Sequence, residues 1–484
     1  MKTDAGKKLA ISLIPILILT ALLSLNVSIF GSDAITGSSQ VALLFSAGVC
    51  ILLSMWLFKT PWKAFEDGIK ENMSDVMVAI VILLFIGAVS GTWTMSGVVP
   101  AFICYGIKII SPKVFLMTAC AICAIVSLMT GSSWTTIATI GVALLGIGKA
   151  EGFSDGMTAG AIISGAYFGD KISPLSDTTV MASSMNRVPL FTHIRYMLCT
   201  TVPSITITLL IFLVLGLSHS GTDASVIRKY TEVLQANFHI SAWLMVVPLL
   251  TVIMIARKMP ALAVLALSTL TAAVCAVAMQ PEIIHGIGSQ ITEGSKVKVM
   301  LAGIIKTVYD SVSVETGNAE VNGLLASRGM TGMLNTIFLI LSAMCFGACM
   351  KASGMLDTIG NAIVSLAKGR TSLVASTVTT GTLLNAVVSD QYLSIIMTSN
   401  LFKDVYEKKG FEDRLLSRSV EDSATVTSPL IPWSSCGMTQ ATILSVPTIT
   451  YLPFCFFNMI SPLMSILIAA TGYKIFQKKI TSKS

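Results

Sequence analysis

Apolar runs of about twenty residues, separated by short polar gaps, follow one another along almost the whole chain. Runs of this length predict membrane-spanning helices, because about 20 apolar residues cross the hydrocarbon core of a bilayer. The first series of expected segments comprises 9–30, 40–58, 76–92, 97–110, 114–148, 156–185 and 196–218. The second series comprises 241–256, 260–279, 333–350, 355–367, 372–402, 415–440 and 450–473. The pattern predicts an all-α polytopic membrane protein with about 12–14 membrane segments.

Short motifs recur between the two series at similar spacing. The sequence TG occurs at 130–131 and 380–381, and SPL occurs at 173–175 and 428–430. An odd number of segments in each copy would place the copies in opposite orientations, as in many secondary transporters. We therefore expect two inverted repeats with broken helices or re-entrant hairpins. The expected boundaries are 1–218 for the first transmembrane repeat, 219–240 for an external connection, 241–473 for the second, inverted repeat and 474–484 for a cytoplasmic tail.

Composition and charge support a membrane location. The 484 residues are 54% hydrophobic and only 12% charged, about half the charged fraction of a soluble domain, and the mean hydropathy is +0.80. These values exclude a soluble enzyme and a nucleic-acid-binding protein despite the net charge of +7. With the N-terminus in the cytoplasm, 22 of the 32 Lys and Arg residues fall in gaps on the inner side. The positive-inside rule then predicts that both termini are cytoplasmic.

A cluster of hydroxyl groups interrupts the first series within the sequence TGSSWTTIAT. Ser132, Ser133 and Thr136 lie close to Gly131, and we expect the helix to break at this glycine. A break would free backbone carbonyls and hydroxyls to replace the hydration shell of a small cation. Hydroxyls that only join neighbouring helices are the alternative.

The sequence GDKISPLSDTT, which follows, places three charges at the expected membrane depth, Asp170, Lys171 and Asp177. Each charge costs about 2.5–3.5 kcal/mol there on insertion scales, so it needs a partner or a function. We expect Lys171 to neutralise Asp170. Pro174 predicts a second break, with Ser173 capping a half-helix that begins at Pro174. Asp177 would then lie in the first turns of that half-helix.

The second series contains its own polar residues, but its acids do not align with those of the first. Asn385 and Asp390 follow the second TG motif, whereas Glu421 and Asp422 precede the second SPL motif. We therefore expect an asymmetric site, with a common backbone frame and unequal ligands. Acids that merely cap helices near the interface are the alternative.

Carboxylates, hydroxyls and broken backbone together offer hard oxygen ligands, which suit Na⁺ better than a transition metal. The expected ion- or substrate-binding residues are Ser132, Ser133, Thr136, Asp170, Ser173, Ser176, Asp177, Thr178, Asn385, Asp390, Glu421, Asp422 and Ser428. The expected Na⁺ ligands among them are Asp177, Ser173 and Ser133. We expect no cofactor, with Na⁺ and H⁺ as transported ions.

These motifs resemble the NhaC family of Na⁺/H⁺ antiporters, within the ion transporter superfamily. The resemblance rests on GDKISPLSDTT, on the TGSSW block before it and on the later block from Glu421 to Trp433 with SPLIPW. It covers nearly the whole chain. It implies Na⁺ export driven by H⁺ entry, a bacterial inner membrane, and a scaffold that supports a mobile, elevator-like transport domain. A homodimer is an assembly consistent with it.

Two transport hypotheses follow, together with one from another class. The first is Na⁺/H⁺ antiport by alternating access. The second is exchange of organic anions such as malate and lactate with Na⁺ and H⁺, which the same resemblance allows. For this function, Lys171, Asn385, Gln391 and the N-termini of half-helices would form the anion pocket. An intramembrane enzyme or a channel is disfavoured, because no HExxH motif occurs and two broken repeats suit alternating access.

Overall fold

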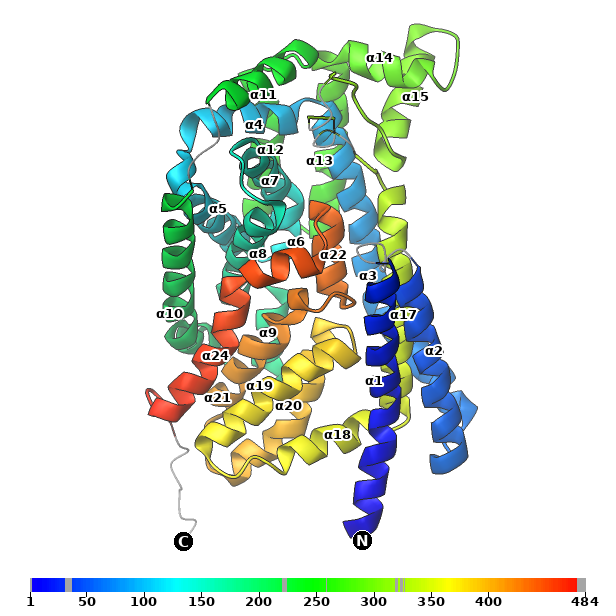
Figure 1. The fold of residues 1–484 in the computed structure, drawn as a ribbon, viewed down its shortest axis with the longest axis vertical. Helices are drawn as coiled ribbons and strands as arrows, with labels where there is room; N and C mark the ends of the chain where they lie inside the picture. The colour runs from blue at the N-terminus through cyan, green and yellow to red at the C-terminus, as the bar shows by residue number, and fades with distance from the viewer. Residues whose placement is uncertain are drawn as a thin grey trace.

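The computed structural model describes residues 2–30, 37–219, 224–257, 259–317, 321–322, 325 and 327–476. Helices make up nearly all of these ranges, which contain a single isolated β-bridge, between Val312 and Ser327, and no strand. The start of α1 and the end of α24 lie at the same end of the molecule, and α14 and α15 lie at the opposite end (Figure 1). The all-α expectation is confirmed.

The same order of helices occurs twice. The first set comprises α3 (Trp62–Met95), α4 (Val98–Ile109), α5 (Phe115–Thr130), the continuous α6, η4 and α7 (Ser133–Ala150), α8 (Asp155–Ile172), α9 (Asp177–Met185) and α10 (Leu190–Leu217). The second set comprises α17 (Leu334–Ala352), α18 (Met355–Val364), α19 (Arg370–Val387), α20 (Gln391–Lys408), α21 (Asp413–Val420) with the π-helix η7 (Glu421–Thr425), α22 (Ser435–Leu444) and α24 (Phe456–Thr471). The opposite orientation of the two sets stays a prediction.

Apart from the four-residue α23 (Thr448–Tyr451) in the second set and short 3₁₀- and π-helical turns, the remaining helices precede the first set or lie between the sets. They are α1 (Lys2–Phe30), α2 (Ser38–Leu53), α11 (Ala224–Asn237), α12 (Val246–Ala256), α13 (Ala261–Met279), α14 (Pro281–Ser289) and α15 (Lys296–Tyr309). The expected connection 219–240 therefore contains a helix, although residues 220–223 lie outside the described residues. Residues 477–484 of the expected tail also lie outside the described residues.

One turn illustrates the correspondence between the sets. In each, a Ser-Gly pair separates the first long helix from the short one that follows, and its glycine has a positive φ, +86° at Gly97 and +69° at Gly354. Residues with a β-carbon rarely adopt this conformation, so glycine is favoured at both positions. In the first set the helices on either side of the break are bent by 66°.

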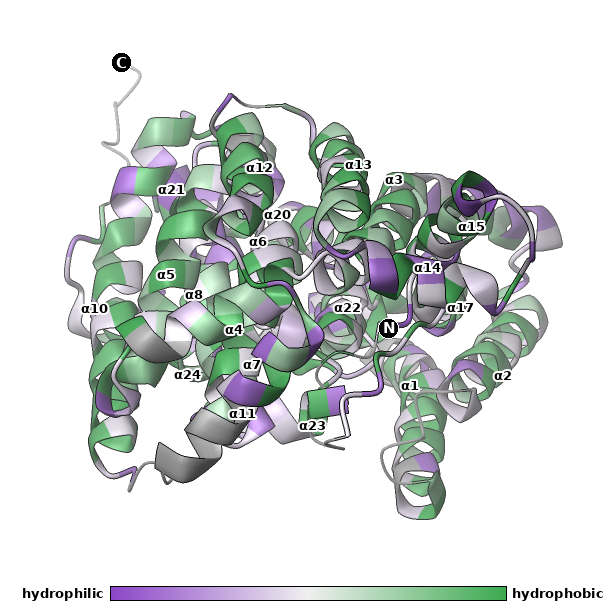
Figure 2. Ribbon diagram, turned by 90° about the horizontal axis from the view of Figure 1, so that it is seen from above, coloured by the Kyte–Doolittle hydropathy of each residue, from purple (hydrophilic) through white to green (hydrophobic). Residues whose placement is uncertain are grey.

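Seven helices among the described residues are long and apolar enough to cross a membrane, or up to ten if each of three bent pairs forms one span. Hydrophobic residues predominate along most of the helices when the molecule is seen from above (Figure 2). The remaining expected segments consist of shorter helices that break within them. Some helix boundaries also differ from those expected: α3 begins at Trp62, whereas the expected segment begins at residue 76. The apolar pattern missed the first turns of α3 because these turns are polar. The Lys70–Glu66 ion pair, 2.6 Å long, supports those turns.

Close backbone packing joins α5 to α8. A β-carbon added to Gly165 would overlap the carbonyl of Cys120, and one added to Gly169 would lie 2.6 Å from the Leu128 nitrogen. Small residues allow membrane helices to approach this closely. The Ser127 hydroxyl then reaches the Ala166 carbonyl at 2.6 Å. This contact fixes the position of α8, whose C-terminal end carries Asp170 and Lys171.

Gly165→Ala is therefore expected to destabilise the protein by about 1–3 kcal/mol, because the added methyl group forces α5 away from α8. Thermal unfolding of the purified protein in detergent measures the loss. Gly286→Ala is the matched control, since no atom lies within 4 Å of the added carbon in α14. Equal melting temperatures for the two variants would contradict the packing argument.

Candidate functional site

The breaks expected at Gly131 and around Pro174 both exist, and they touch each other. Gly131 ends α5 with φ +66°, and a β-carbon there would lie 2.6 Å from the Leu175 carbonyl carbon. This close approach, as well as the positive φ, requires glycine. The backbone groups freed at one break therefore face those freed at the other.

The helix cap after the second break lies three residues later than expected. Ser173 was expected to cap a helix starting at Pro174, but Ser176 caps α9, which starts at Asp177. The Ser173 hydroxyl instead donates to the Leu128 carbonyl at 2.8 Å and accepts from the Leu175 nitrogen at 3.2 Å. Ser176 is the better cap because an acidic residue follows it directly, where the helix dipole favours negative charge.

Asp170 binds the start of the helix that follows the first break. Its Oδ2 accepts hydrogen bonds from the Ser133 nitrogen at 3.1 Å and from the Ser133 hydroxyl at 2.7 Å. The side chain of Asp170 is only 6% exposed. The positive end of the helix and the serine hydroxyl together compensate the carboxylate inside the protein.

The second set contains an equivalent pair of touching breaks. Ser389, with φ +65°, separates α19 from α20, and its carbonyl accepts from the Ser435 nitrogen at 2.8 Å. Asp390 caps α20 through its Oδ1, which accepts from the Leu393 nitrogen at 3.0 Å. Its Oδ2 accepts from the Ser435 hydroxyl at 3.3 Å. A carboxylate thus sits at a helix start in both sets, although the acids come from different sequence positions.

A cavity of about 930 Å³ lies between the breaks and three unbroken helices; we refer to it as the central cavity. One wall is apolar and consists of Val78 and Ile82 of α3, residues 259–261 and Val264 at α13, and Ile340 of α17. The opposite wall comes from the breaks and carries the polar groups. Its polar and aromatic members include Thr130, Ser132, Ser133, Trp134, Thr135, Asp170, Ser176, Asp177, Thr178, Ser184, Asp390, Gln391, Tyr392 and Ser435.

The central cavity is acidic. Asp170, Asp177 and Asp390 line it, whereas no Lys, Arg or His is found among the described residues of its walls. Asp177 is the most accessible of the three carboxylates, because its side chain is exposed whereas those of Asp170 and Asp390 are buried. The starts of four helices also meet here, at Ser133, Asp177, Gln391 and Ser435. The carboxylates and hydroxyls of the wall offer oxygen ligands and negative charge to a cation, whereas the helix starts hold the carboxylates in place.

Of the expected binding residues, seven line the central cavity: Ser132, Ser133, Asp170, Ser176, Asp177, Thr178 and Asp390. The other six lie outside it: Thr136, Ser173, Asn385, Glu421, Asp422 and Ser428. Glu421 lies directly behind the wall, where its Oε1 accepts from the Thr178 hydroxyl at 3.2 Å. Asn385 joins α19 to η7 by donating to the Ala424 carbonyl at 2.6 Å.

Sequence reasoning missed several wall residues as binding candidates, among them Trp134, Tyr392 and Ser435. Each lies within a few residues of a break that the polar motifs indicated. The only available signal was therefore proximity to a break, because aromatic side chains in a membrane segment are more often packed in the core. Gln391 was considered only for an anion pocket, although it lies among acids.

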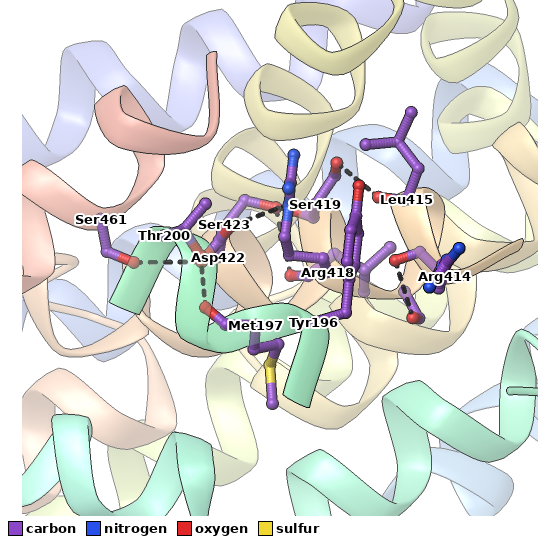
Figure 3. Close-up of polar contacts among 12 residues, drawn as sticks. Tyr196, Met197, Thr200, Arg414, Leu415, Arg418, Ser419, Asp422, Ser423 and Ser461 are labelled. Carbon is purple, nitrogen blue, oxygen red and sulfur yellow. Dashed lines mark hydrogen bonds and ion pairs between the residues drawn. The ribbon is translucent and has the colours of Figure 1, made fainter. Parts of the chain in front are cut away.

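Lys171 does not neutralise Asp170, contrary to expectation. Its ammonium donates to Asp422 Oδ1 and to the Ser461 hydroxyl, the latter at 2.9 Å, and both ion-pair side chains are fully buried. Adjacent residues on a helix point in different directions, so the neighbour in sequence is a poor partner. The Thr200 and Ser461 hydroxyls also donate to Asp422 Oδ1, at 3.1 and 3.2 Å (Figure 3). These contacts join α8, α10, η7 and α24.

The chain is similar in sequence to several known antiporters. A profile of the Na⁺/H⁺ antiporter family matches residues 6–185 and 165–473. The Na⁺/H⁺ antiporter NhaC of Alkalihalophilus pseudofirmus is 36% identical over 88% of this chain and 89% of its own. The malate-2H⁺/Na⁺-lactate antiporter of Bacillus subtilis is 34% identical over 91% of both chains. The arginine/ornithine antiporter ArcD of Halobacterium salinarum is 30% identical over 96% of this chain and 93% of its own.

Asp422→Asn is expected to lower the free energy of unfolding by about 3–5 kcal/mol, because it leaves the buried Lys171 without its negative partner. Thermal unfolding in detergent measures this change. Asp155→Asn is the control: Asp155 pairs with Lys149 at 3.1 Å, but its side chain is 41% exposed, so its loss is worth about 1 kcal/mol or less. A wild-type melting temperature for Asp422→Asn would show that the buried pair contributes little.

Proposed function

This chain belongs to the Na⁺/H⁺ antiporter family, and on that premise we propose that it exports Na⁺ in exchange for H⁺ by alternating access. The central cavity is the proposed binding site for both ions. Its three carboxylates and the absence of Lys, Arg and His among the described wall residues are the observation that carries this proposal. Carboxylates that line one cavity together attract a cation.

In the proposed mechanism, Na⁺ and H⁺ compete for the same oxygens. A carboxylate that leaves water loses its hydration and requires a compensating charge. Either Na⁺ or a proton on Asp177 meets this requirement, whereas the empty, ionised site does not. Movement of the acidic wall along the apolar wall of α3, α13 and α17 is then unfavourable for the empty site. Coupling follows from this barrier, because only a loaded site changes sides.

Ser133 and Asp177 are the proposed Na⁺ ligands that line the cavity, with Asp170 and Asp390 as nearby acids. Ser173 is not among the proposed ligands, since it lies outside the cavity and its hydroxyl donates a hydrogen bond to the Leu128 carbonyl. Hydroxyl and carboxylate oxygens match the hard-ligand preference of a small cation. Thr178 connects this set to Glu421 behind the wall.

Exchange of organic anions is the second candidate function. The malate/lactate antiporter of Bacillus subtilis among the relatives favours it. Against it stands the central cavity itself, because Lys171, the cation expected to bind the anion, pairs with Asp422 away from the cavity wall. Without that cation, only helix starts, Gln391 and hydroxyl groups of the wall remain to bind the carboxylates of the substrate. Na⁺/H⁺ exchange therefore fits this cavity better.

We place the protein in a bacterial inner membrane with both termini in the cytoplasm. The excess of Lys and Arg in the gaps assigned to the inner side supports this orientation. The start of α1 and the end of α24 at one end of the molecule are consistent with it (Figure 1). We propose that the lipid bilayer surrounds the apolar outer surface. We also propose that the protein assembles as a homodimer.

Purified protein in liposomes tests the function. Vesicles loaded with Na⁺ and diluted into Na⁺-free buffer should acidify, because each exported Na⁺ brings H⁺ inward. A pH-sensitive dye in the lumen reports the change. Parallel vesicles loaded with malate or lactate test the second candidate. Acidification that requires an organic anion would favour anion exchange, and vesicles that show no pH change under either condition would contradict both.

Asp177→Asn is expected to abolish Na⁺-driven acidification, because it keeps the shape of the side chain but removes the charge that binds Na⁺ or H⁺. Expression and melting temperature should stay close to wild type, since Asp177 is exposed to the cavity. Asp155→Asn, whose carboxylate is screened by water, should exchange within about twofold of wild type. An active Asp177→Asn, or a folded but inactive Asp155→Asn, would show that the site is placed wrongly.

A further inference from the structure

Arg418 is a fully buried cation whose charge is only partly compensated. It lies on α21, and none of its three guanidinium nitrogens has a hydrogen-bond partner among the described residues. Its Nε lies 3.9 Å from Asp422 Oδ2, beyond hydrogen-bond distance. The Tyr196 ring lies 4.7 Å from its Cζ and provides a cation–π contact (Figure 3). A guanidinium keeps its charge in proteins, so this arrangement is unfavourable unless another state improves it.

The two oxygens of the Asp422 carboxylate have different neighbours. Oδ1 accepts from Lys171, Thr200 and Ser461. Oδ2 is the oxygen that faces Arg418, and it has no hydrogen-bond partner within the described part of the chain. Two buried cations therefore share one carboxylate, and one of them is bonded to it. A movement of about 1 Å would bring the Arg418 Nε into ordinary hydrogen-bond distance of Oδ2.

The backbone at Asp422 is suited to such a movement. Asp422 lies in η7, a π-helical turn at Glu421–Thr425, whereas Arg418 lies in the regular helix before it. π-helical turns are rare and are frequently found at functional sites. A change between π- and α-helical hydrogen bonding would rotate Asp422 relative to Arg418. No loop has to open for the two side chains to meet.

The pair of Lys171 and Asp422 also lies directly behind the central cavity. Lys171 follows Asp170 of the cavity wall, and Asp422 follows Glu421, which accepts a hydrogen bond from Thr178 of the same wall. The ion pair thus ties the broken helix α8 to η7 at the level of the proposed ion site. Any displacement of one helix relative to the other must stretch or replace this pair.

We propose that Arg418 is a positioning residue of the exchange cycle that competes with Lys171 for the Asp422 carboxylate. In the state described here, Asp422 is bonded to Lys171; in another state of the cycle, it is bonded to Arg418. The exchange of partners lets α8 and η7 shift without leaving Asp422 as an uncompensated buried charge. This inference rests on the proposed alternating access, and it assigns a role to a residue outside the ion site.

Arg418→Met tests the inference in liposomes and in detergent. Methionine retains an apolar side chain but removes the second partner of Asp422. We expect the maximal rate of Na⁺-driven acidification to fall at least tenfold, while the KM for Na⁺ changes less than threefold, because Arg418 does not line the cavity. The melting temperature should stay the same or rise, since a buried charge that is only partly compensated is removed. Arg418→Lys, which keeps the charge, should recover at least a third of the rate.

Arg414→Met is the matched control on the same helix. Arg414 also stacks on Tyr196, with its Cζ 5.2 Å from the ring, but its ion-pair partner is Glu412. The maximal rate of Na⁺-driven acidification by Arg414→Met should stay within twofold of wild type. A wild-type rate for Arg418→Met, an equal loss in Arg414→Met, or a lower melting temperature for Arg418→Met would each overturn the proposal.

Substitution of Lys171 tests directly whether Arg418 can replace it as the partner of Asp422. If Arg418 replaces it, Lys171→Met should remain folded, whereas Lys171→Met combined with Arg418→Met should melt at a much lower temperature than either single variant. Equal melting temperatures for the Lys171→Met variant and the double variant would contradict the competition. These melting measurements need no transport, so they distinguish a failure of this inference from a failure of Na⁺/H⁺ exchange in the wild-type protein.

Discussion

A helix that breaks inside a membrane exposes backbone donors and acceptors that lipid cannot satisfy, and this constraint organises the structure. The protein meets it by placing breaks in contact with one another. Gly131 approaches the backbone of Leu175 in the first set, and the Ser389 carbonyl accepts from the Ser435 nitrogen in the second. Because each break is buried against another, the freed polar groups can surround the central cavity without facing lipid.

The same constraint applies to charge. Asp170 and Asp390 are buried, and each binds the start of a helix or a serine beside one. The charge of Asp422 is compensated differently, by an ion pair with Lys171. The difference separates two regions: carboxylates compensated by helix starts face the cavity, where a cation can join them, while the carboxylate compensated by an ammonium lies behind it. Binding and mechanical coupling are therefore assigned to different acids.

The sequence predicted the features that depend on local chemistry. The helix breaks could be predicted because Gly131 and Pro174 restrict the backbone wherever they occur. The partner of Lys171 could not be predicted, because Asp422 lies 251 residues away and the pairing depends on how α8 packs against η7. The cap at Ser176 was missed for a smaller reason: the Ser-Pro pair offered an equally good local pattern three residues earlier. Arg418 gave no signal at all, since a charged residue near an expected helix end is ordinary.

Proton release on Na⁺ binding tests the central claim most directly. Na⁺ added to purified wild-type protein in weakly buffered detergent should release protons, because both ions compete for the cavity carboxylates, and the apparent Kd for Na⁺ should rise as the pH falls. Asp177→Asn should release none. Na⁺ binding of unchanged affinity across the pH range, without proton release, would contradict the account.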